Sequence, residues 1–144
     1  MSFYLDASFL VTLIVEEVHS ATADRWWRLH GGDTKIISGF AAAEVAATLS
    51  RGVRTQRFSE AQARAALEDF DSLRGTCEAF APTIETFSHA EILVRDFVTK
   101  LAAPDALHLA SAMYAGASLV TFDERLATAA RMSWVDVIVP ASTL

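Results

Sequence analysis

Hydrophobic positions along the chain form short apolar runs separated by longer stretches with helical spacing. Five runs have the length of a β-strand, at residues 3–5, 35–38, 77–81, 118–122 and 135–139. Between them, apolar side chains recur every three or four residues, which is the spacing of one face of an α-helix. These helical stretches cover residues 9–18, 20–30, 40–51, 59–74, 87–97, 104–115 and 123–132. Strands that alternate with helices predict a parallel sheet with helices on both faces.

Residues that start and stop helices agree with this pattern. Ser59 and Gln62 have the spacing of a capping box, and Gly75 follows the same stretch as a stop signal. Pro104 suits the first turn of a helix, and Gly116 lies just beyond its end. We therefore expect an α/β fold with a central, mostly parallel five-stranded sheet.

Composition limits the chain to a few classes of protein. Its 144 residues, 52% of them hydrophobic, fit a single domain over residues 1–144 with one core. Cys77 is the only cysteine, which excludes an intramolecular disulfide and a thiolate zinc site and suits a reducing compartment; we expect it in the core. No signal peptide or membrane-spanning stretch is visible, so we expect a cytoplasmic protein without a membrane partner.

The net charge of −6 disfavours a broad basic surface for nucleic acid. Two interpretations remain open: the protein does not bind nucleic acid, or its acidity is concentrated where divalent cations reverse the local sign.

Three aspartates fall where a parallel sheet gathers function, beyond the carboxyl ends of its strands. Asp6 and Asp123 each follow a predicted strand, and Asp105 lies in the first turn of a helix. Each also has a purely structural explanation, because carboxylates cap helix N-termini and interact favourably with the helix dipole. Ser8 could cap the first helix equally well, so Asp6 is not needed for that task.

Glu44 is the most informative acid, because it is the sole charge in a helix that otherwise reads as core. Burying an unpaired carboxylate costs several kcal/mol, roughly, unless a cation or hydrogen-bond donors compensate. The structural alternative is a solvent-facing Glu44 on a narrow polar stripe with Thr48 and Arg51. We favour the functional interpretation.

Four carboxylates at one edge would repel one another unless cations or protons bind among them. Oxygen ligands suit Mg²⁺ or Mn²⁺, which keep waters and share their sites with substrate phosphates. Two such ions can orient a water for in-line attack and stabilise the leaving oxygen. The residues thus point to hydrolysis of phosphodiester bonds.

Three segments resemble PIN-domain toxins of the VapC type. Residues 4–8 (YLDAS) look like the opening of that family, residues 104–110 (PDALHLA) are similar to its third acidic motif, and residues 120–123 (VTFD) to its fourth. The resemblance covers essentially the whole chain and implies a PIN-like three-layer αβα sandwich. It also implies that Asp6, Glu44, Asp105 and Asp123 are the metal-binding and catalytic carboxylates, with supporting roles for the hydroxyls of Ser8 and Thr121.

The same resemblance implies an Mg²⁺- or Mn²⁺-dependent endoribonuclease that cleaves single-stranded RNA, leaving 5′-phosphate and 3′-hydroxyl ends. It further implies a homodimer, and a hetero-oligomer with a VapB-type antitoxin that occupies the active-site groove. Some PIN domains carry a further acid one turn after the fourth, where this chain has Leu126. One well-held metal is therefore expected, and a second only with RNA bound.

Other residues carry weaker signals. His108 is expected to pack or to form hydrogen bonds rather than to act as a base or ligand. Adjacent Trp26 and Trp27 must face different directions, so we expect one in the core and the other exposed at a dimer or antitoxin interface. A loose basic cluster, at Arg51, Arg54 and Arg57, is either a phosphate contact or solvated surface.

Competing folds with a similar pattern lack their required residues. A receiver-like phosphoacceptor domain needs an Asp after a middle strand and a Lys after the last, but Ala81-Pro82 ends the third run and no Lys follows Lys100. A haloacid-dehalogenase-type phosphatase needs a second Asp at position 8, where Ser8 stands. The remaining alternative is a catalytically inactive PIN-fold interaction module, against which the retention of all four acids argues.

Overall fold

Five parallel strands form the centre of the protein. The computed structural model describes residues 1–142. Neighbouring strands pair in the order β3-β2-β1-β4-β5, and every pair is parallel. The strands are β1 (Ser2–Leu5), β2 (Thr34–Ser38), β3 (Glu78–Phe80), β4 (Ser118–Val120) and β5 (Val137–Ile138). The predicted parallel five-stranded sheet is confirmed.

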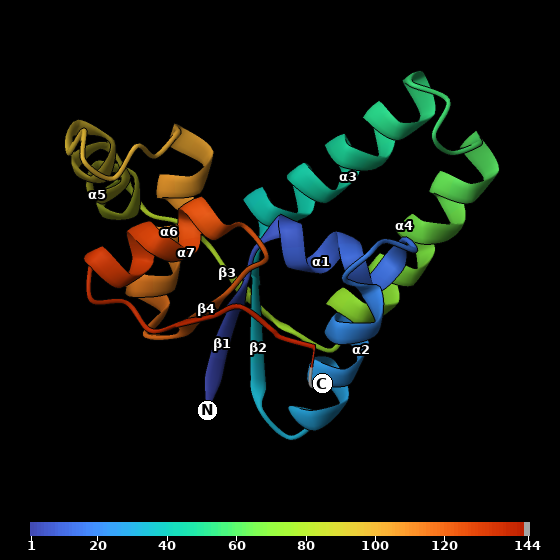
Figure 1. Ribbon diagram of the computed structural model, residues 1–144, viewed down its shortest axis with the longest axis horizontal. Helices are drawn as coiled ribbons and strands as arrows, with labels where there is room; N and C mark the ends of the chain where they lie inside the picture. Colours follow the sequence, from blue (N-terminus) through green and yellow to red (C-terminus); the bar gives the residue numbers. More distant parts are fainter. Residues whose placement is uncertain (143–144) are drawn as a thin grey trace.

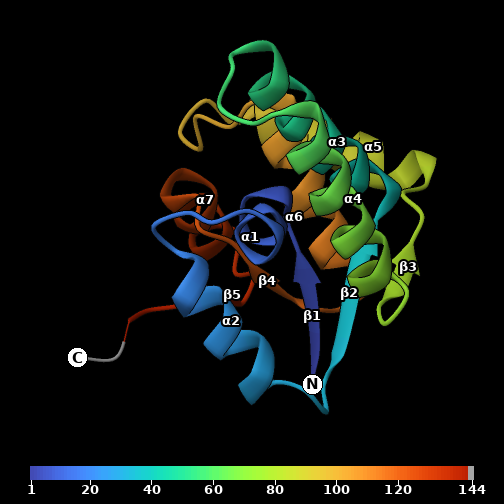
Figure 2. The ribbon, with the colours of Figure 1, turned by 90° about the vertical axis from the view of Figure 1, so that its right-hand side faces the viewer.

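Helices cover both faces of this sheet, as Figures 1 and 2 show. One core lies between the sheet and α1 to α4, and the other between the sheet and α5 to α7. The helices are α1 (Ala7–Ile14), α2 (Ser20–Leu29), α3 (Gly39–Arg54), α4 (Glu60–Arg74), α5 (Ile84–Arg95), α6 (Ala103–Ala115) and α7 (Glu124–Met132). This is the expected three-layer αβα sandwich.

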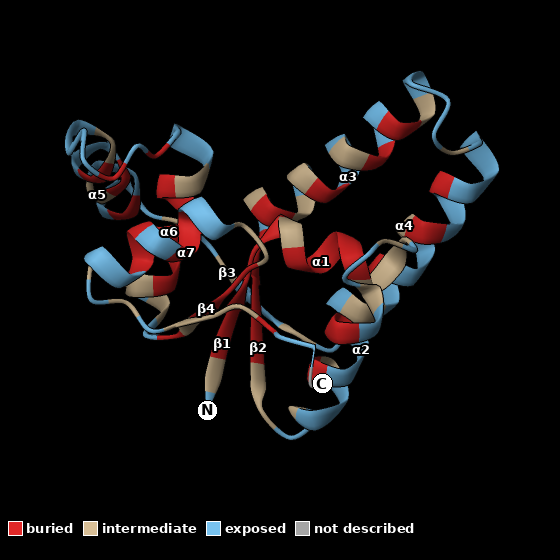
Figure 3. Ribbon diagram, viewed as in Figure 1, coloured by how far each residue is buried: buried red, intermediate tan, exposed pale blue. Residues whose placement is uncertain are grey.

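The central strand β1 explains how two cores share one sheet. Successive side chains of a strand point to opposite faces. Phe3 and Leu5 accordingly belong to the core under α1 to α4, whereas Tyr4 belongs to the core under α5 to α7. All three are fully buried, and Figure 3 shows burial concentrated on the sheet and the inner helix faces.

Helix ends follow the predicted signals. Ser59 and Gln62 form the capping box at the start of α4. Gly116 ends α6 in the left-handed conformation, with φ of 61°, where glycine has no Cβ to strain. Asp6 and Asp123 are the N-caps of α1 and α7, with side chains that accept backbone N–H groups.

Some predicted boundaries were wrong. The first helix ends at Ile14, which leaves Val18 exposed in a turn, and α5 ends at Arg95, which leaves Phe97 86% exposed. The fourth and fifth strands are shorter than predicted, so two residues separate β4 from Asp123. Helical periodicity does not register the turns that follow these helices, because apolar side chains also occur in them.

The predictions for the aromatic pair and for the cysteine are confirmed in part. Trp26 is in the core, and Trp27 is half-buried beneath the Lys35 ammonium, which lies 4.8 Å from its ring centroid. Cys77 is half-buried against the core under α1 to α4, where burial raises the pKa of its thiol. No helix among residues 1–142 is long and apolar enough to cross a bilayer.

Candidate active site at the carboxyl edge of the sheet

The four predicted acids come from elements that start at one edge of the sheet. Asp6 directly follows β1, and its backbone N–H donates to the Val120 carbonyl at the end of neighbouring β4 (3.3 Å). Asp123 lies three residues beyond that strand end, Glu44 is on α3 after β2, and α6 begins with Asp105 in its first turn. Because β2, β1 and β4 are adjacent, this topology brings four chain segments together.

Asp6 is almost completely buried, with 3% of its surface exposed. Its carboxylate accepts hydrogen bonds from the Ser8 hydroxyl (2.8 and 2.9 Å), the Phe9 backbone N–H (3.0 Å) and the Thr121 hydroxyl (2.5 Å). Asp6 itself therefore caps α1, and Ser8 does not replace it in that task.

Ser8 and Thr121 connect the Asp6 carboxylate to the loop after β4. While donating to Asp6, Ser8 Oγ accepts the Phe122 backbone N–H (3.0 Å), and Thr121 Oγ1 accepts the Asp123 backbone N–H (2.9 Å). The two hydroxyl oxygens are 3.1 Å apart. The expected support of Asp6 by these hydroxyls is thus present as hydrogen bonds, and the same bonds fix the position of Asp123.

Burial dominates the electrostatics of Asp6. It raises the pKa of the carboxyl above its ordinary value, although the hydrogen bonds from Thr121, Phe9 and Ser8, and the proximity of His108, all lower it. A carboxylate that remains costly to ionise despite so many donors is one that a cation would stabilise.

Glu44 is held by a histidine from another layer. His108 is buried, and its Nε2 lies 2.9 Å from Glu44 Oε1. On the other side of the ring, Nδ1 lies 2.9 Å from the Tyr4 hydroxyl, which lies 2.8 Å from Ser38 Oγ. The predicted hydrogen-bonding role of His108 is confirmed.

The direction of these hydrogen bonds follows from the groups at the ends. A carboxylate accepts, so Nε2 donates to Glu44; when the ring carries one proton, Nδ1 accepts from Tyr4. Burial raises the pKa of Tyr4 to about 12, so its hydroxyl stays protonated and able to donate. Ser38, the N-cap of α3, accepts the Ala41 N–H and can donate to Tyr4. One chain of bonds thus links the start of α3 to the Glu44 carboxylate.

The burial expected of Glu44 was wrong. Its side chain is 32% exposed, and the neighbouring Ala43, Ala46 and Ala47 face solvent. Alanine is small and occurs on both faces of a helix, so an alanine-rich segment does not reveal which side is buried. The polar stripe considered as the alternative is present, since Thr48 is half-buried one turn on and donates to the Glu44 carbonyl.

The pKa of Asp105 depends on its burial and on the charges of the other three acids. Burial raises the pKa of the Asp105 carboxyl, and the negative charge of Asp123 raises it further. His108 opposes the increase, while Glu44 and Asp6 add to it. Asp105 is therefore close enough to each of the other three predicted carboxylates for their charges to raise its pKa.

Asp123 lies at the rim of this group. Its side chain accepts the Leu126 N–H (3.0 Å), which is the structural role expected of an N-cap. Leu126 is fully buried, and Glu124 is exposed. Neither residue supplies the further acid that some PIN domains carry.

The side chains do not form a closed metal cage. Among residues 1–142, no three His, Cys, Asp or Glu side chains converge closely enough to hold an ion between them. The four predicted acids nevertheless offer only carboxylate oxygens as donor atoms, and the pKa values of Asp6 and Asp105 are raised. This donor set fits Mg²⁺ or Mn²⁺, which retain waters and need only one or two protein carboxylates.

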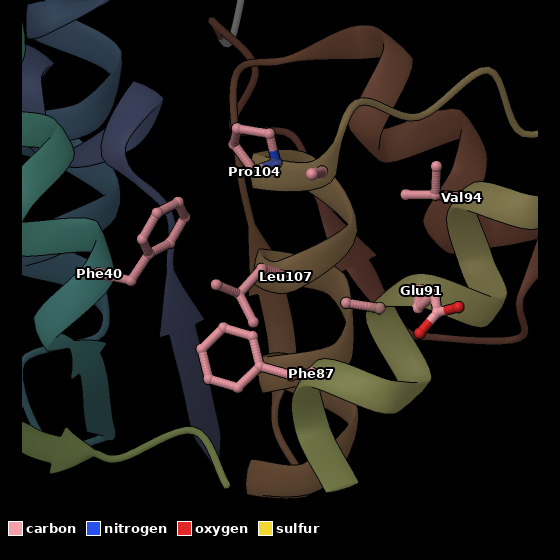
Figure 4. A pocket seen from close by; sticks show the side chains of 8 residues that line it. Phe40, Phe87, Glu91, Val94, Pro104 and Leu107 are labelled. Carbon is pink, nitrogen blue, oxygen red and sulfur yellow. The ribbon is translucent and has the colours of Figure 1, made fainter. Parts of the chain in front are cut away.

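Two hollows adjoin the acids. A cleft of about 430 Å³ lies between α1, α3 and the loop after β4, and Ser8, Glu44 and Asp123 line it. A second pocket of about 400 Å³ lies between α3, α5 and α6, with an almost wholly apolar lining. Figure 4 shows Phe40 of α3 facing Leu107 and Phe87 across this pocket.

The basic cluster lies at the far end of α3. Arg54 donates to Ser50 on its own helix, and Arg57 pairs with Glu17 (2.6 Å) in the loop between α1 and α2. Figure 1 shows this end of the α3–α4 hairpin projecting away from the sheet. Arg57 therefore ties the turn after α3 to the loop before α2, through Glu17, which lines the cleft of about 430 Å³.

Sequence comparison identifies a family for nearly all of the chain. Residues 3–132 match the family described as PIN domain. Among curated proteins, no match is found.

Solved structures with the same fold cover almost the full length. VapBC2 from Rickettsia felis, bound to a DNA fragment from its promoter, has a TM-score of 0.73 at 19% identity, over 96% of this chain and 98% of that chain. VapC20 from Mycobacterium tuberculosis, described as a sarcin–ricin loop cleaving toxin, has a TM-score of 0.71 at 21% identity, over 88% and 94%. DNA-bound VapBC from Salmonella typhimurium has a TM-score of 0.70 at 14% identity, over 96% and 97%. These likenesses show a shared fold.

Proposed function

This chain belongs to the PIN domain family, and we propose that it is an Mg²⁺- or Mn²⁺-dependent endoribonuclease that hydrolyses phosphodiester bonds in single-stranded RNA. The observation that carries the proposal is that acids from separate chain segments meet at one edge of the sheet. Glu44 and Asp123 line one cleft, and the Thr121 hydroxyl joins the Asp6 carboxylate to the Asp123 backbone N–H. Asp105 lies near enough for these acids to raise its pKa. Clustered carboxylates raise each other's pKa values, so a site of this kind favours a divalent cation. Such a cation, when bound, supplies positive charge for the substrate phosphate and lowers the pKa of a bound water.

The chain's own residues perform the positioning. Asp6, fixed by Ser8, Thr121 and the Phe9 N–H, offers a carboxylate whose orientation is set before any ligand arrives. Glu44 is oriented by His108 and faces the cleft. Preorganised groups need no rearrangement when charge develops on the phosphate, which is the main source of electrostatic catalysis.

The proposed biological role is that of a toxin paired with an antitoxin, acting in the cytoplasm. The similar solved structures support it, because they include VapBC proteins and a sarcin–ricin loop cleaving toxin. We propose a VapB-type antitoxin as the partner, which occupies the acidic cleft and forms a hetero-oligomer with this chain.

Self-association is proposed as well. Phe87 is 56% exposed at the edge of the apolar pocket between α3, α5 and α6. Apolar surface of this kind on a small domain supports contact with a second copy, and the pocket borders the active site through Pro104, next to Asp105.

The test is cleavage of a single-stranded RNA by the purified protein, free of antitoxin. Cleavage is expected with Mg²⁺ or Mn²⁺, to stop with EDTA, and to leave 5′-phosphate and 3′-hydroxyl ends. Asp6→Asn is expected to abolish it, while Glu124→Gln, which changes an exposed acid beside Asp123, should cut normally. Wild-type protein that folds but cuts no RNA would favour the alternative of a non-catalytic PIN-fold interaction module.

A further inference from the structure

We propose that His19 and Phe122 form a stacking platform for one nucleobase of the RNA, beside the carboxylates that act on the backbone. This inference rests on the proposed function and deepens it, because it names the part of the substrate that the cleft recognises. A stacked base contributes to binding whatever its identity, since every base has a π-face.

A row of aromatic rings leads from the core to the cleft. The rings of Trp26 and Phe9 meet edge to face with centroids 5.2 Å apart, and Phe9 stacks on Phe122 at 5.7 Å. His19 then stacks on Phe122, with centroids 4.5 Å apart and planes 9° from parallel. Phe9 is fully buried, Phe122 is half-buried and His19 is exposed, so the row is anchored inside and ends at the surface.

The end of this row lies in the acidic cleft. His19 and Phe122 line the same hollow of about 430 Å³ as Ser8, Glu44 and Asp123. One face of the His19 ring is covered by Phe122, and the side chain as a whole is exposed, so a flat ligand has access to the imidazole. Because Asp123 directly follows Phe122 in the chain, the platform and the acidic edge are held by one loop.

The charges of the cleft select the base rather than the phosphate at this position. Glu17, Glu44 and Asp123 line the cleft, and no Lys or Arg is among its lining residues. Arg57 pairs with Glu17 (2.6 Å), which leaves Glu44 and Asp123 as the acids that, among residues 1–142, face a ligand without an arginine partner. Carboxylates repel a phosphate that lacks a cation, whereas a nucleobase is uncharged and binds through its π-face. A nucleotide bound here therefore places its base on the rings and its phosphate where a cation resides.

The His19 side chain is not needed to start α2. It is the N-cap residue of α2, but its side chain makes no capping hydrogen bond. The helix begins instead with the backbone carbonyl of His19 accepting the Ala23 N–H (2.9 Å). Replacing the ring should therefore leave α2 intact.

The experiment measures steady-state cleavage of a single-stranded RNA by the full chain with Mg²⁺. For His19→Ala we expect KM to rise about tenfold, the effect of losing one base–aromatic stack, with kcat within about twofold of wild type. His19→Phe keeps a flat ring and is expected to retain the wild-type KM. His89→Ala is the matched control, because His89 is a half-buried histidine whose ring contacts Tyr114 and which does not line the cleft.

A second readout observes stacking itself. RNA oligonucleotides with 2-aminopurine at successive positions are mixed with the protein in a stopped-flow instrument, before cleavage proceeds. Stacking quenches this base, so one position is expected to lose fluorescence with wild type and His19→Phe but not with His19→Ala. The platform would be overturned if wild type cleaves RNA and His19→Ala has the same KM as wild type. It would also be overturned if the fluorescence is quenched at no position. Absence of cleavage by wild type would instead overturn the proposed function, and the platform with it.

Discussion

At the scale of single residues, the site holds carboxylates whose charge is unfavourable until a cation or a proton binds. Asp105 is half-buried and lies near Asp123, and both the burial and the nearby negative charge raise its pKa. Functional sites commonly lower the stability of the folded protein in this way, because the groups that bind a cation or substrate are destabilising when no ligand is bound. The cost should be measurable as a dependence of stability on pH.

We predict that Asp105→Asn raises the thermal unfolding midpoint at pH 7–8 in EDTA. In the unfolded chain the carboxyl ionises at its ordinary pKa of about 4, whereas the folded protein resists ionisation. The folded state therefore loses stability as pH rises from the unfolded-state pKa of Asp105 to its higher folded-state pKa, and the loss persists at higher pH. Asparagine removes that loss, so the advantage of the variant should disappear below about pH 4.

Thermal unfolding from pH 3.5 to 8 checks this prediction. Asp71→Asn, at an exposed position on α4, is the control and should show no such gain. An Asp105→Asn protein that is less stable than wild type at pH 8 in EDTA would contradict the electrostatic account of the site.

The hydrogen bonds behind Glu44 make a separate prediction. Tyr4→Phe removes the hydroxyl that holds His108 Nδ1 while keeping the buried ring. Residues that orient a metal-binding group typically change affinity or activity 10- to 100-fold, so we expect cleavage to fall at least about tenfold. The apparent affinity for Mn²⁺ should fall with it, because the Glu44 carboxylate is less fixed. Tyr114→Phe, on the same helix as His108, is the control; equal activity of both variants would show that the chain of bonds does not position Glu44.

At the scale of helices and loops, the α3–α4 hairpin depends on one glycine. A Cβ on Gly52 would lie 2.1 Å from the Phe58 ring, which packs against the core under α1 to α4. Arg57 in the same turn contacts the Phe58 ring and pairs with Glu17. The turn after α3 therefore packs tightly on both sides. Position 52 of α3 has no room for a side chain, and Arg57 is bound to Glu17 in the loop beside the cleft.

We predict that Gly52→Ala lowers the free energy of unfolding by about 1–3 kcal/mol, the usual cost of overpacking. A glycine in an open helical position would behave in the opposite way, because alanine has the higher helix propensity. Gly39, on the same helix with open space around its Cα, provides that control. Urea unfolding of both variants decides the matter, and equal stabilisation by the two substitutions would contradict the packing of Phe58 on Gly52.

The order of elements could be predicted from sequence because it depends on local patterns. The capping box at Ser59 and the glycine stop at Gly116 act within a few residues, and both occur as predicted. The parallel direction of the strands followed from general rules for alternating strands and helices. The extension of the first helix to Val18 failed, because an apolar residue in a turn continues a pattern without continuing the helix.

The acids proposed for the site could be selected from the sequence, but their surroundings could not. Asp6, Glu44, Asp105 and Asp123 stand out by position and by resemblance, but the buried setting assigned to Glu44 was wrong. The pairing of His108 with Tyr4 joins residues 104 positions apart, which no local pattern encodes. One clue was available: a tyrosine inside a buried strand needs a partner for its hydroxyl. The stack of His19 on Phe122 has no comparable signal in the sequence.

At the scale of the whole molecule, two surfaces remain to be occupied. We propose that the acidic cleft binds RNA and the antitoxin, and that the apolar pocket around Phe40 and Phe87 contacts a second copy of the chain.

We predict that Phe87→Glu shifts the protein toward a monomer, because a buried charge without a partner opposes association. Sedimentation at several concentrations measures this, with Phe97→Glu, exposed in the turn after α5, as the matched control. A Phe87→Glu dimer as tight as wild type would exclude this face.

The central claim is that four carboxylates at the sheet edge bind a divalent cation and use it to hydrolyse RNA. Its most direct test is the rate of single-stranded RNA cleavage against Mn²⁺ concentration, for wild type and Asp105→Asn, after EDTA treatment. The account predicts a saturable rate for wild type, none without the cation, and none at any Mn²⁺ concentration for the folded variant. Cleavage that persists in EDTA, or that proceeds equally in Asp105→Asn, would contradict it.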